Sequence, residues 1–293
     1  MVALTKYLKY AIMRRYMSKS DSKARIAKYQ ATVLDLYVDS RGTLDDISRR
    51  LIEASRGKII DGSIEQVMLI TWAVIRKESD YILGQFAVAK PHELEQNQRN
   101  YYMSARYCIE AMADLLYLYK HQEELGRYFT DSAKIQTRLG EIYKNKTTSS
   151  EKKAREVSKL LREGQLKGQI IDRVADLSPE LLREYAVYCL YTHPTYEGHQ
   201  LYFHCDESYD MMFCEICHTL TLVLQHLIAF LRANCKYFAV DKELLKGLVA
   251  QFYDNDRQMC NVYYAKHYSE FKMTKAEMNA ELEKIYRAID QWD

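Results

Sequence analysis

The scarcity of glycine and proline restricts the fold of this chain more than any other feature. Its 293 residues include only 10 glycines and 3 prolines, which are Pro91, Pro179 and Pro194. Hairpins, bulges and sandwich loops depend on these two residue types to turn the backbone, so long stretches without them favour long helices. The sequence therefore predicts an all-α fold, a helical bundle of long antiparallel helices with additional N- and C-terminal helices.

Breaks in the helical pattern divide the chain into three predicted parts. Residues 1–62 are predicted to form N-terminal helices, 63–240 a core helical bundle and 241–293 C-terminal helices. Within the core, the segment near 144–162 is charged and poor in apolar residues, which predicts an exposed helix or a mobile connection. The basic, tyrosine-bearing helix at 5–17 is predicted to dock on the bundle or on a second copy, with single-stranded nucleic acid as the alternative.

Charge and hydropathy exclude several classes of protein. The 42 Lys and Arg residues nearly balance 40 Asp and Glu residues, so no global field draws the chain onto DNA or an acidic membrane. The 7 cysteines lack the spacing of a disulfide scaffold and no signal peptide is recognisable, which predicts reduced thiols and a cytoplasmic location. The most apolar segment, 220–231, is shorter than a membrane span and contains Gln225 and His226, so we expect a buried core helix and no membrane partner.

Two predicted helices carry the residues of a candidate site. In the long helix that begins near Asn97, one stripe is polar and aromatic and contains Tyr102, Arg106 and Glu110. The other stripe is apolar and consists of Ala105, Cys108, Ile109, Met112, Leu115, Leu116 and Tyr119. Further along, Ser178 and Pro179 provide a helix start signal. The helix that follows carries Tyr185, Cys189 and His193 at i, i+4 and i+8, so these three side chains share one face.

This set of residues suits phosphate chemistry if the two helices pack face to face. The Arg106 guanidinium would bind a phosphate, His193 would transfer a proton, and Glu110 would orient one of them. Tyr102, Tyr185 and Cys189 are the predicted ligand contacts beside this catalytic set. The alternative is a structural Arg–Glu pair that joins two helices and a histidine that caps one of them, and spacing leaves both interpretations open.

Two sequence stretches resemble the motif regions of a bacterial all-helical family of unknown function. They are SARYCIEAMADLLYLYKHQ at 104–122 and YAVYCLYTHP at 185–194. The family pattern reads Arg-x3-Glu and then Tyr-x3-Ser-x3-His-Pro, and Arg106, Glu110, Tyr185, His193 and Pro194 match it. Cys189 stands where the family has Ser, which argues against a role that needs a hydroxyl there. The resemblance implies a common architecture over 63–231.

That family is in turn similar to the HEPN helical bundles, several of which are metal-independent ribonucleases. The resemblance implies RNA or another phosphate-bearing ligand, no cofactor, and a role in bacterial antiviral defence or as a toxin. In HEPN nucleases the Arg and His lie a few residues apart on one helix, whereas Arg183 and His193 are ten apart here. The competing hypothesis is a non-catalytic interaction or scaffold protein that binds a protein partner or forms a homodimer or larger homo-oligomer.

A cysteine pair suggests a metal site as an alternative to burial. Cys214 and Cys217 are spaced as Cys-x-x-Cys, and His204, Cys205 and His218 lie nearby. Thiolate and imidazole ligands at such spacing suit zinc. A second Cys-x-x-Cys is missing, and cysteines in an apolar helix are usually core residues, so burial is the preferred interpretation.

Overall fold

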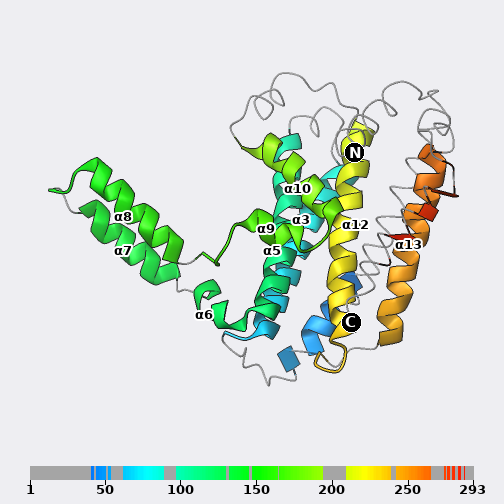
Figure 1. Cartoon of the computed structure of the whole chain (residues 1–293), viewed down its shortest axis with the longest axis horizontal. Coiled ribbons are helices and arrows are strands. Elements are labelled where there is room, and N and C mark those ends of the chain that lie inside the picture. The colour runs from blue at the N-terminus through cyan, green and yellow to red at the C-terminus, as the bar shows by residue number, and fades with distance from the viewer. Residues whose placement is uncertain are drawn as a thin grey trace.

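The computed structural model describes residues 41–42, 44–50, 52–53, 62–88, 97–129, 132–144, 147–163, 165–193, 209–238 and 242–264, with isolated positions between 274 and 287. Every regular element in these ranges is a helix, and none of the described residues lies in a strand (Figure 1). The prediction of an all-α fold is therefore confirmed. The predicted helix at 5–17 lies outside the described residues.

Four long helices lie side by side and form the bundle (Figure 1). They are α3 (Ile64–Val88), α5 (Gln98–Lys120), α12 (Tyr209–Ala233) and α13 (Lys242–Tyr264). The central element is α5, which packs against α3 and α12 and also against the shorter helices α9 (Ile170–Ala175) and α10 (Pro179–Thr192). Its apolar stripe is buried as predicted at Cys108, Ile109 and Met112, whereas Tyr119 is 37% exposed and lies edge-on to Phe230 with ring centroids 5.1 Å apart.

Local capping sets the starts of two helices that position the site. The Ser178 hydroxyl accepts a hydrogen bond from the Leu181 N–H at 3.1 Å, and Pro179 occupies the first turn of α10. The Ser63 hydroxyl accepts from the Gln66 N–H at 3.2 Å at the start of α3. Both contacts satisfy backbone donors that the first turn of a helix leaves unpaired, and α10 begins where Ser178 and Pro179 predict a helix start.

The helix α12 forms the apolar centre of the bundle. Nearly all of its described side chains are buried, including Leu222, Val223 and Phe230, which confirms the predicted core helix. The apolar segment 220–231 lies inside α12, which extends beyond it on both sides. Among the described residues, 216–233 is the one stretch long and apolar enough to cross a membrane, and it is mostly buried inside the protein.

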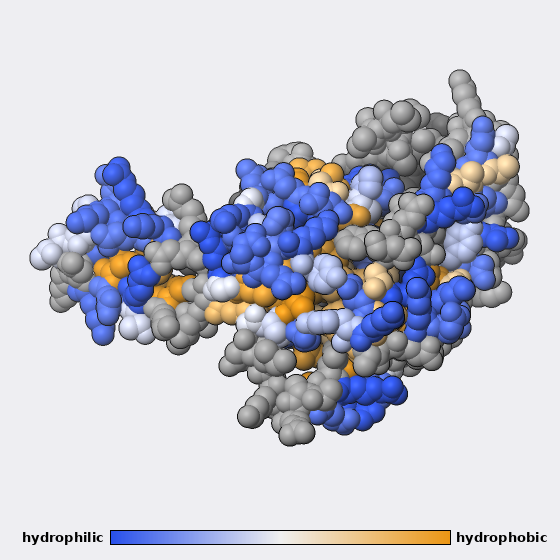
Figure 2. Space-filling model, turned by 60° about the horizontal axis from the view of Figure 1, so that its bottom comes forward, coloured by the Kyte–Doolittle hydropathy of each residue, from blue (hydrophilic) through white to orange (hydrophobic). Residues whose placement is uncertain are grey.

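Two helices form an arm that extends from the bundle (Figure 1). The arm consists of α7 (Ser132–Lys144) and α8 (Ser150–Glu163), which pack against each other. A 3-10 helix, η1 (Gln122–Glu124), and the short helix α6 (Leu125–Tyr128) connect it to α5. Hydrophilic residues cover the outer faces of the arm, and apolar residues show between its two helices (Figure 2). The predicted exposed helix near 144–162 is thus α8 together with the preceding turn.

Candidate functional site

The candidate site lies where the polar stripe of α5 meets α10. Arg106 and Glu110 are one turn apart on α5, and the Arg106 Nε–H donates to Glu110 Oε1 at 2.8 Å. Both side chains are about four-fifths buried, with 20% and 22% exposed. Partial burial opposes the charge of Arg106, but the hydrogen bond and charge of Glu110 outweigh it and raise the pKa of Arg106. The guanidinium is therefore a fixed cation.

Tyr185 of α10 completes the support of this pair. Its hydroxyl donates to Glu110 Oε1 at 3.0 Å, and its ring lies 5.7 Å from the Arg106 guanidinium carbon. Burial, the Glu110 charge and the neighbouring Cys189 thiol all raise the pKa of Tyr185 above its usual range. Tyr185 therefore stays protonated and keeps donating, which leaves Glu110 with two donors that hold its carboxylate in place.

The end of α10 brings Thr192 to the same guanidinium. Arg106 Nη1 donates to Thr192 Oγ1 at 2.9 Å, and that hydroxyl donates to the Tyr188 carbonyl at 2.8 Å. The Thr192 carbonyl in turn accepts from Arg99 Nη2 at 2.7 Å. The sequence analysis missed Thr192, although its spacing of four from Tyr188 places it on the face of α10 that meets α5.

His193 is the exposed member of the cluster. It caps the C-terminus of α10, and its Nε2 lies 3.5 Å from Arg106 Nη1. Because a guanidinium can only donate, Nε2 faces it with a lone pair, and the ring proton of the neutral form then lies on Nδ1. Arg106 and His193, which are 87 residues apart in sequence, therefore meet, which is the condition that the phosphate interpretation of the sequence required.

Two predicted ligand contacts lie deeper than the rest of the site. Tyr102 is fully buried, stacks on Tyr191 with ring centroids 5.0 Å apart and packs against Tyr188 at 5.2 Å. Its ring packs against two tyrosines of α10 and is covered from solvent, so a direct contact between Tyr102 and a ligand does not fit this packing. Cys189 is half-buried beside Tyr185 and is a free thiol.

A second arginine cluster lies one turn further along the same face of α5. Arg173 of α9 donates from Nε to Asp114 Oδ1 at 2.8 Å, and its guanidinium carbon lies 5.5 Å from the ring centroid of Tyr117. Its Nη1 donates to the carbonyls of Lys167 and Gly168 at 3.1 and 3.3 Å. Burial raises the pKa of Asp114, while Arg173 acts in the opposite direction. This pairing connects segments 59 residues apart and was not predicted.

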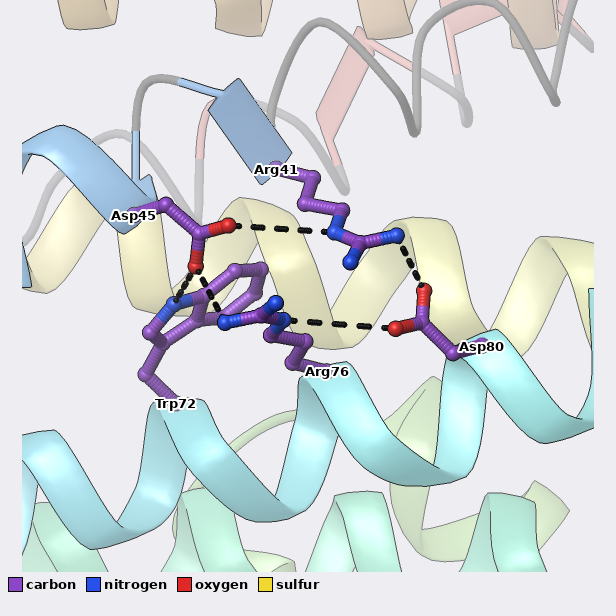
Figure 3. Close-up of polar contacts among 5 residues, drawn as sticks. All are labelled: Arg41, Asp45, Trp72, Arg76 and Asp80. Atoms are coloured by element: carbon purple, nitrogen blue, oxygen red, sulfur yellow. Dashed lines mark hydrogen bonds and ion pairs between the residues drawn. The ribbon is translucent and has the colours of Figure 1, made fainter.

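A third cluster joins the helical residues 44–50 to α3 (Figure 3). Asp45 accepts from the Trp72 indole at 2.9 Å and from Arg76 at 3.1 Å, while Arg41 donates to Asp80 at 2.9 Å. The two arginines and two aspartates balance in charge and are occupied with one another and with the Trp72 indole. The arrangement holds two helical segments together and offers no acid–base chemistry.

The predicted zinc ligands fall mostly outside the described part of the chain. The positions of His204 and Cys205 are not described, nor is the side chain of Cys214. Cys217 is buried in α12, and His218 is half-buried next to it. Within the described ranges, no group of three His, Cys, Asp or Glu side chains is placed to hold a metal ion.

The chain matches no protein-family model, no curated protein and no solved structure. The geometry of the α5–α10 site is therefore the basis on which its function is argued.

Proposed function

We propose that the α5–α10 site binds a phosphate-bearing ligand, RNA by preference, and acts as a metal-independent ribonuclease of the HEPN-like type. The observation that carries this proposal is the 3.5 Å contact between Arg106 Nη1 and the exposed His193 imidazole. A fixed cation and a proton-transfer group at that separation can engage one phosphodiester together.

The contact between Arg106 and His193 is the weakest bond in the cluster. Its 3.5 Å length is at the limit for a hydrogen bond, whereas the bonds from Arg106 to Glu110 and Thr192 are 2.8 and 2.9 Å. A phosphate oxygen in its place would accept a charge-assisted bond of about 2.8 Å. Binding therefore replaces one long contact and leaves the bonds that hold the guanidinium intact.

The reaction that fits these groups is attack of a ribose 2′-hydroxyl on the adjacent phosphorus. His193 Nε2 takes the 2′-hydroxyl proton, the bond from O2′ to phosphorus forms, and the bond from phosphorus to O5′ breaks. The imidazolium then gives the proton to O5′, which leaves a 2′,3′-cyclic phosphate and a free 5′-hydroxyl. Arg106 stabilises the additional negative charge that develops on the phosphate oxygens in the transition state.

Glu110, Tyr185 and Thr192 act as positioning residues in this proposal. Glu110 fixes Arg106 through Nε, Tyr185 fixes Glu110, and Thr192 fixes Nη1. A hydroxyl at position 189 is not required, which agrees with Cys189 standing where the resembled family has Ser. That resemblance supports a role as an effector in a bacterial defence or toxin system, in the cytoplasm and without a cofactor.

A structural role for the same residues is the alternative function. The observation in its favour is that Arg106 already ties α5 to α10 through Thr192, much as Arg173 ties α5 to α9 through Asp114. In that case the chain is a non-catalytic interaction or scaffold protein, in which Arg106 and His193 contribute only to packing and a partner or second copy binds elsewhere.

Separate substitutions Arg106→Ala and His193→Ala distinguish the two functions. The purified full chain is incubated with end-labelled single-stranded RNA, and its thermal unfolding is measured in parallel. We expect the wild type to produce 2′,3′-cyclic ends and to leave 2′-O-methyl RNA intact, and both variants to lose cleavage while His193→Ala keeps its Tm. Absence of cleavage by the wild type, or cleavage by His193→Ala at the wild-type rate, contradicts the proposal.

A further inference from the structure

The arm formed by α7 and α8 differs in charge from the rest of the chain. Residues 132–163 contain nine lysines and arginines and four glutamates, a net charge of +5. The whole chain carries +2, so all other residues together carry −3. The arm is therefore one of two basic regions of the chain, since residues 1–62 contain 13 basic and 7 acidic residues. The arm is the basic element that extends from the described bundle (Figure 1). An overall charge near neutral hides this separation.

The positive charge of α8 is ordered along one face. Lys152, Arg155 and Lys159 follow the i, i+3, i+7 spacing that places side chains on one side of a helix. All three are exposed, and the opposite face, with Val157 and Leu160, packs toward α7. Seven residues of helix span about 10 Å, so the three cations form a row along the outer surface of the arm.

Two of these cations are available for a ligand. Among the described residues, none pairs with the side chain of Lys152 or Lys159, while Arg155 forms an exposed ion pair with Glu151 at 2.5 Å. Exposed pairs of this kind contribute little free energy, so a phosphate can displace the carboxylate. The row therefore presents two ammonium groups without a described partner and one guanidinium held by an exposed pair, with Glu156 as an acidic residue on the same face.

Groups suited to bases and sugars lie on the same arm. Tyr143, near the end of α7, is 67% exposed. It borders a hollow of about 550 Å³ whose other walls are Ser150, Lys153, Ala154, Val157, Ser158 and Gln165. An aromatic ring can stack on a base, and hydroxyl and amide groups can bond to ribose or base edges. An acidic protein surface could pair with the cations but would not require an exposed aromatic ring beside hydroxyl and amide groups. The arm therefore fits single-stranded nucleic acid better.

An ion pair joins the two chain segments at the base of the arm. Glu124, which precedes α7 and is buried, accepts from the ammonium of Lys167, which follows α8, at 2.6 Å. Arg127 lies 3.6 Å from the other oxygen of the same carboxylate. This ion pair closes the base of the arm shortly before α9, whose Arg173 contacts the same face of α5 as the candidate site.

We propose that the α7–α8 arm binds the phosphate backbone of single-stranded RNA through Lys152, Arg155 and Lys159, with Tyr143 stacking on a base. The identity of the ligand rests on the proposed function, but the binding surface is separate from Arg106 and His193. The arm supplies affinity that does not depend on base sequence, and the α5–α10 site supplies the chemistry.

The test compares two triple variants with the same change in net charge. The arm variant is Lys152→Gln, Arg155→Gln and Lys159→Gln, and the control on α13 is Lys242→Gln, Lys246→Gln and Arg257→Gln, all exposed positions. Fluorescence anisotropy measures the affinity of each full-length protein for fluorescein-labelled oligouridine over a range of salt concentrations, and circular dichroism checks helicity.

The arm variant should bind at least about tenfold more weakly than the wild type, and its salt dependence should fall by about 2 in slope, since each lost phosphate contact on a single strand removes about 0.7. The control should bind as the wild type does. Equal binding by both variants, equal weakening of both, or no binding by the wild type overturns the proposal. RNA binding that depends on the arm in a wild type that does not cleave would leave this proposal standing while the proposed function fails.

Discussion

Two arginine clusters lie one turn apart on the same face of α5 and share most of their construction. In each, Nε donates to a carboxylate of α5 at 2.8 Å, to Glu110 from Arg106 and to Asp114 from Arg173. In each, the guanidinium lies over a tyrosine ring, at 5.7 and 5.5 Å. No acceptor for Nη2 is found in either cluster among the described residues. The arginine, the carboxylate and the tyrosine therefore cannot by themselves separate a site from a structural tie.

The two clusters differ in the groups that Nη1 of each arginine contacts. Arg173 donates from Nη1 to two backbone carbonyls and is only 11% exposed. The His121 imidazole packs on the Tyr117 ring at 4.5 Å, but among the described residues it forms no hydrogen bond with Arg173. Arg106 is 20% exposed, and its Nη1 meets the Thr192 hydroxyl and the exposed His193 ring. Backbone carbonyls are fixed by the fold, whereas an exposed side chain can give way to a ligand. The comparison assigns chemistry to the Arg106 cluster and structure to the Arg173 cluster.

Charge-preserving substitutions should give the largest contrast between the clusters. Arg106→Lys keeps the positive charge but loses the planar fork that bridges Glu110, Thr192 and a phosphate, so RNA cleavage should fall by about 100-fold. Arg173→Lys should leave the cleavage rate within about threefold of wild type, since it touches no reacting group. Initial rates on end-labelled RNA measure both. Equal losses of rate in the two variants would remove the distinction.

Substitution by alanine should affect stability in the opposite order, with a larger loss at Arg173 than at Arg106. Arg173→Ala leaves the largely buried Asp114 without its cation and should lower the free energy of unfolding by about 2–3 kcal/mol. Arg106→Ala leaves Glu110 with the Tyr185 hydroxyl as a second donor and should cost less, about 1 kcal/mol. Urea unfolding followed by circular dichroism gives both values. A larger loss for Arg106→Ala than for Arg173→Ala would support the structural alternative for the Arg106 cluster.

The stability defect of Arg173→Ala should depend on pH in a defined direction. Burial raises the pKa of Asp114 above its ordinary value of 3.8, and removal of Arg173 raises it further. In the window between that raised pKa and 3.8, the folded variant binds more protons than the unfolded chain, so acid stabilises it. The difference in unfolding free energy from wild type should therefore shrink as pH falls from 7 toward 4. A constant or growing difference would show that Asp114 is not the group left uncompensated.

The smallest expected effect is that of Tyr185→Phe. This change removes the hydroxyl that donates to Glu110 and keeps the ring beside Arg106. The loss of one hydrogen bond should lower stability by about 1 kcal/mol. Cleavage should fall by less than about tenfold, because the bond from Arg106 to Glu110 remains. A loss of cleavage as large as that of His193→Ala would instead place Tyr185 among the catalytic residues.

The parts of the fold that depend on local sequence could be predicted. Ser63 and Ser178 start helices because each hydroxyl bonds a backbone donor three residues later, and periodicity identifies the buried side of α5. The spacing on α5 and α10 also identified Arg106 and His193 as a pair that would converge if the helices faced each other. Local signals sufficed for each of these residues.

The remainder depends on how helices cross, which spacing along one chain does not determine. Tyr102 and Arg106 lie one turn apart on the same stripe, yet Tyr191 and Tyr188 cover Tyr102 completely while Arg106 stays partly exposed. Likewise, the stripe contains Asp114 but does not indicate that Arg173 will meet it.

The most direct test of the central claim follows the two guanidinium groups and the His193 ring by NMR during addition of uridine 3′-monophosphate. The Arg106 and Arg173 Nε–H signals are assigned from the Arg106→Lys and Arg173→Lys variants, and the imidazole signals from His193→Ala. We predict that the Arg106 and His193 signals shift together along one binding curve while the Arg173 signal does not move. Unchanged Arg106 and His193 signals at saturating nucleotide, or equal shifts at Arg106 and Arg173, would contradict the account.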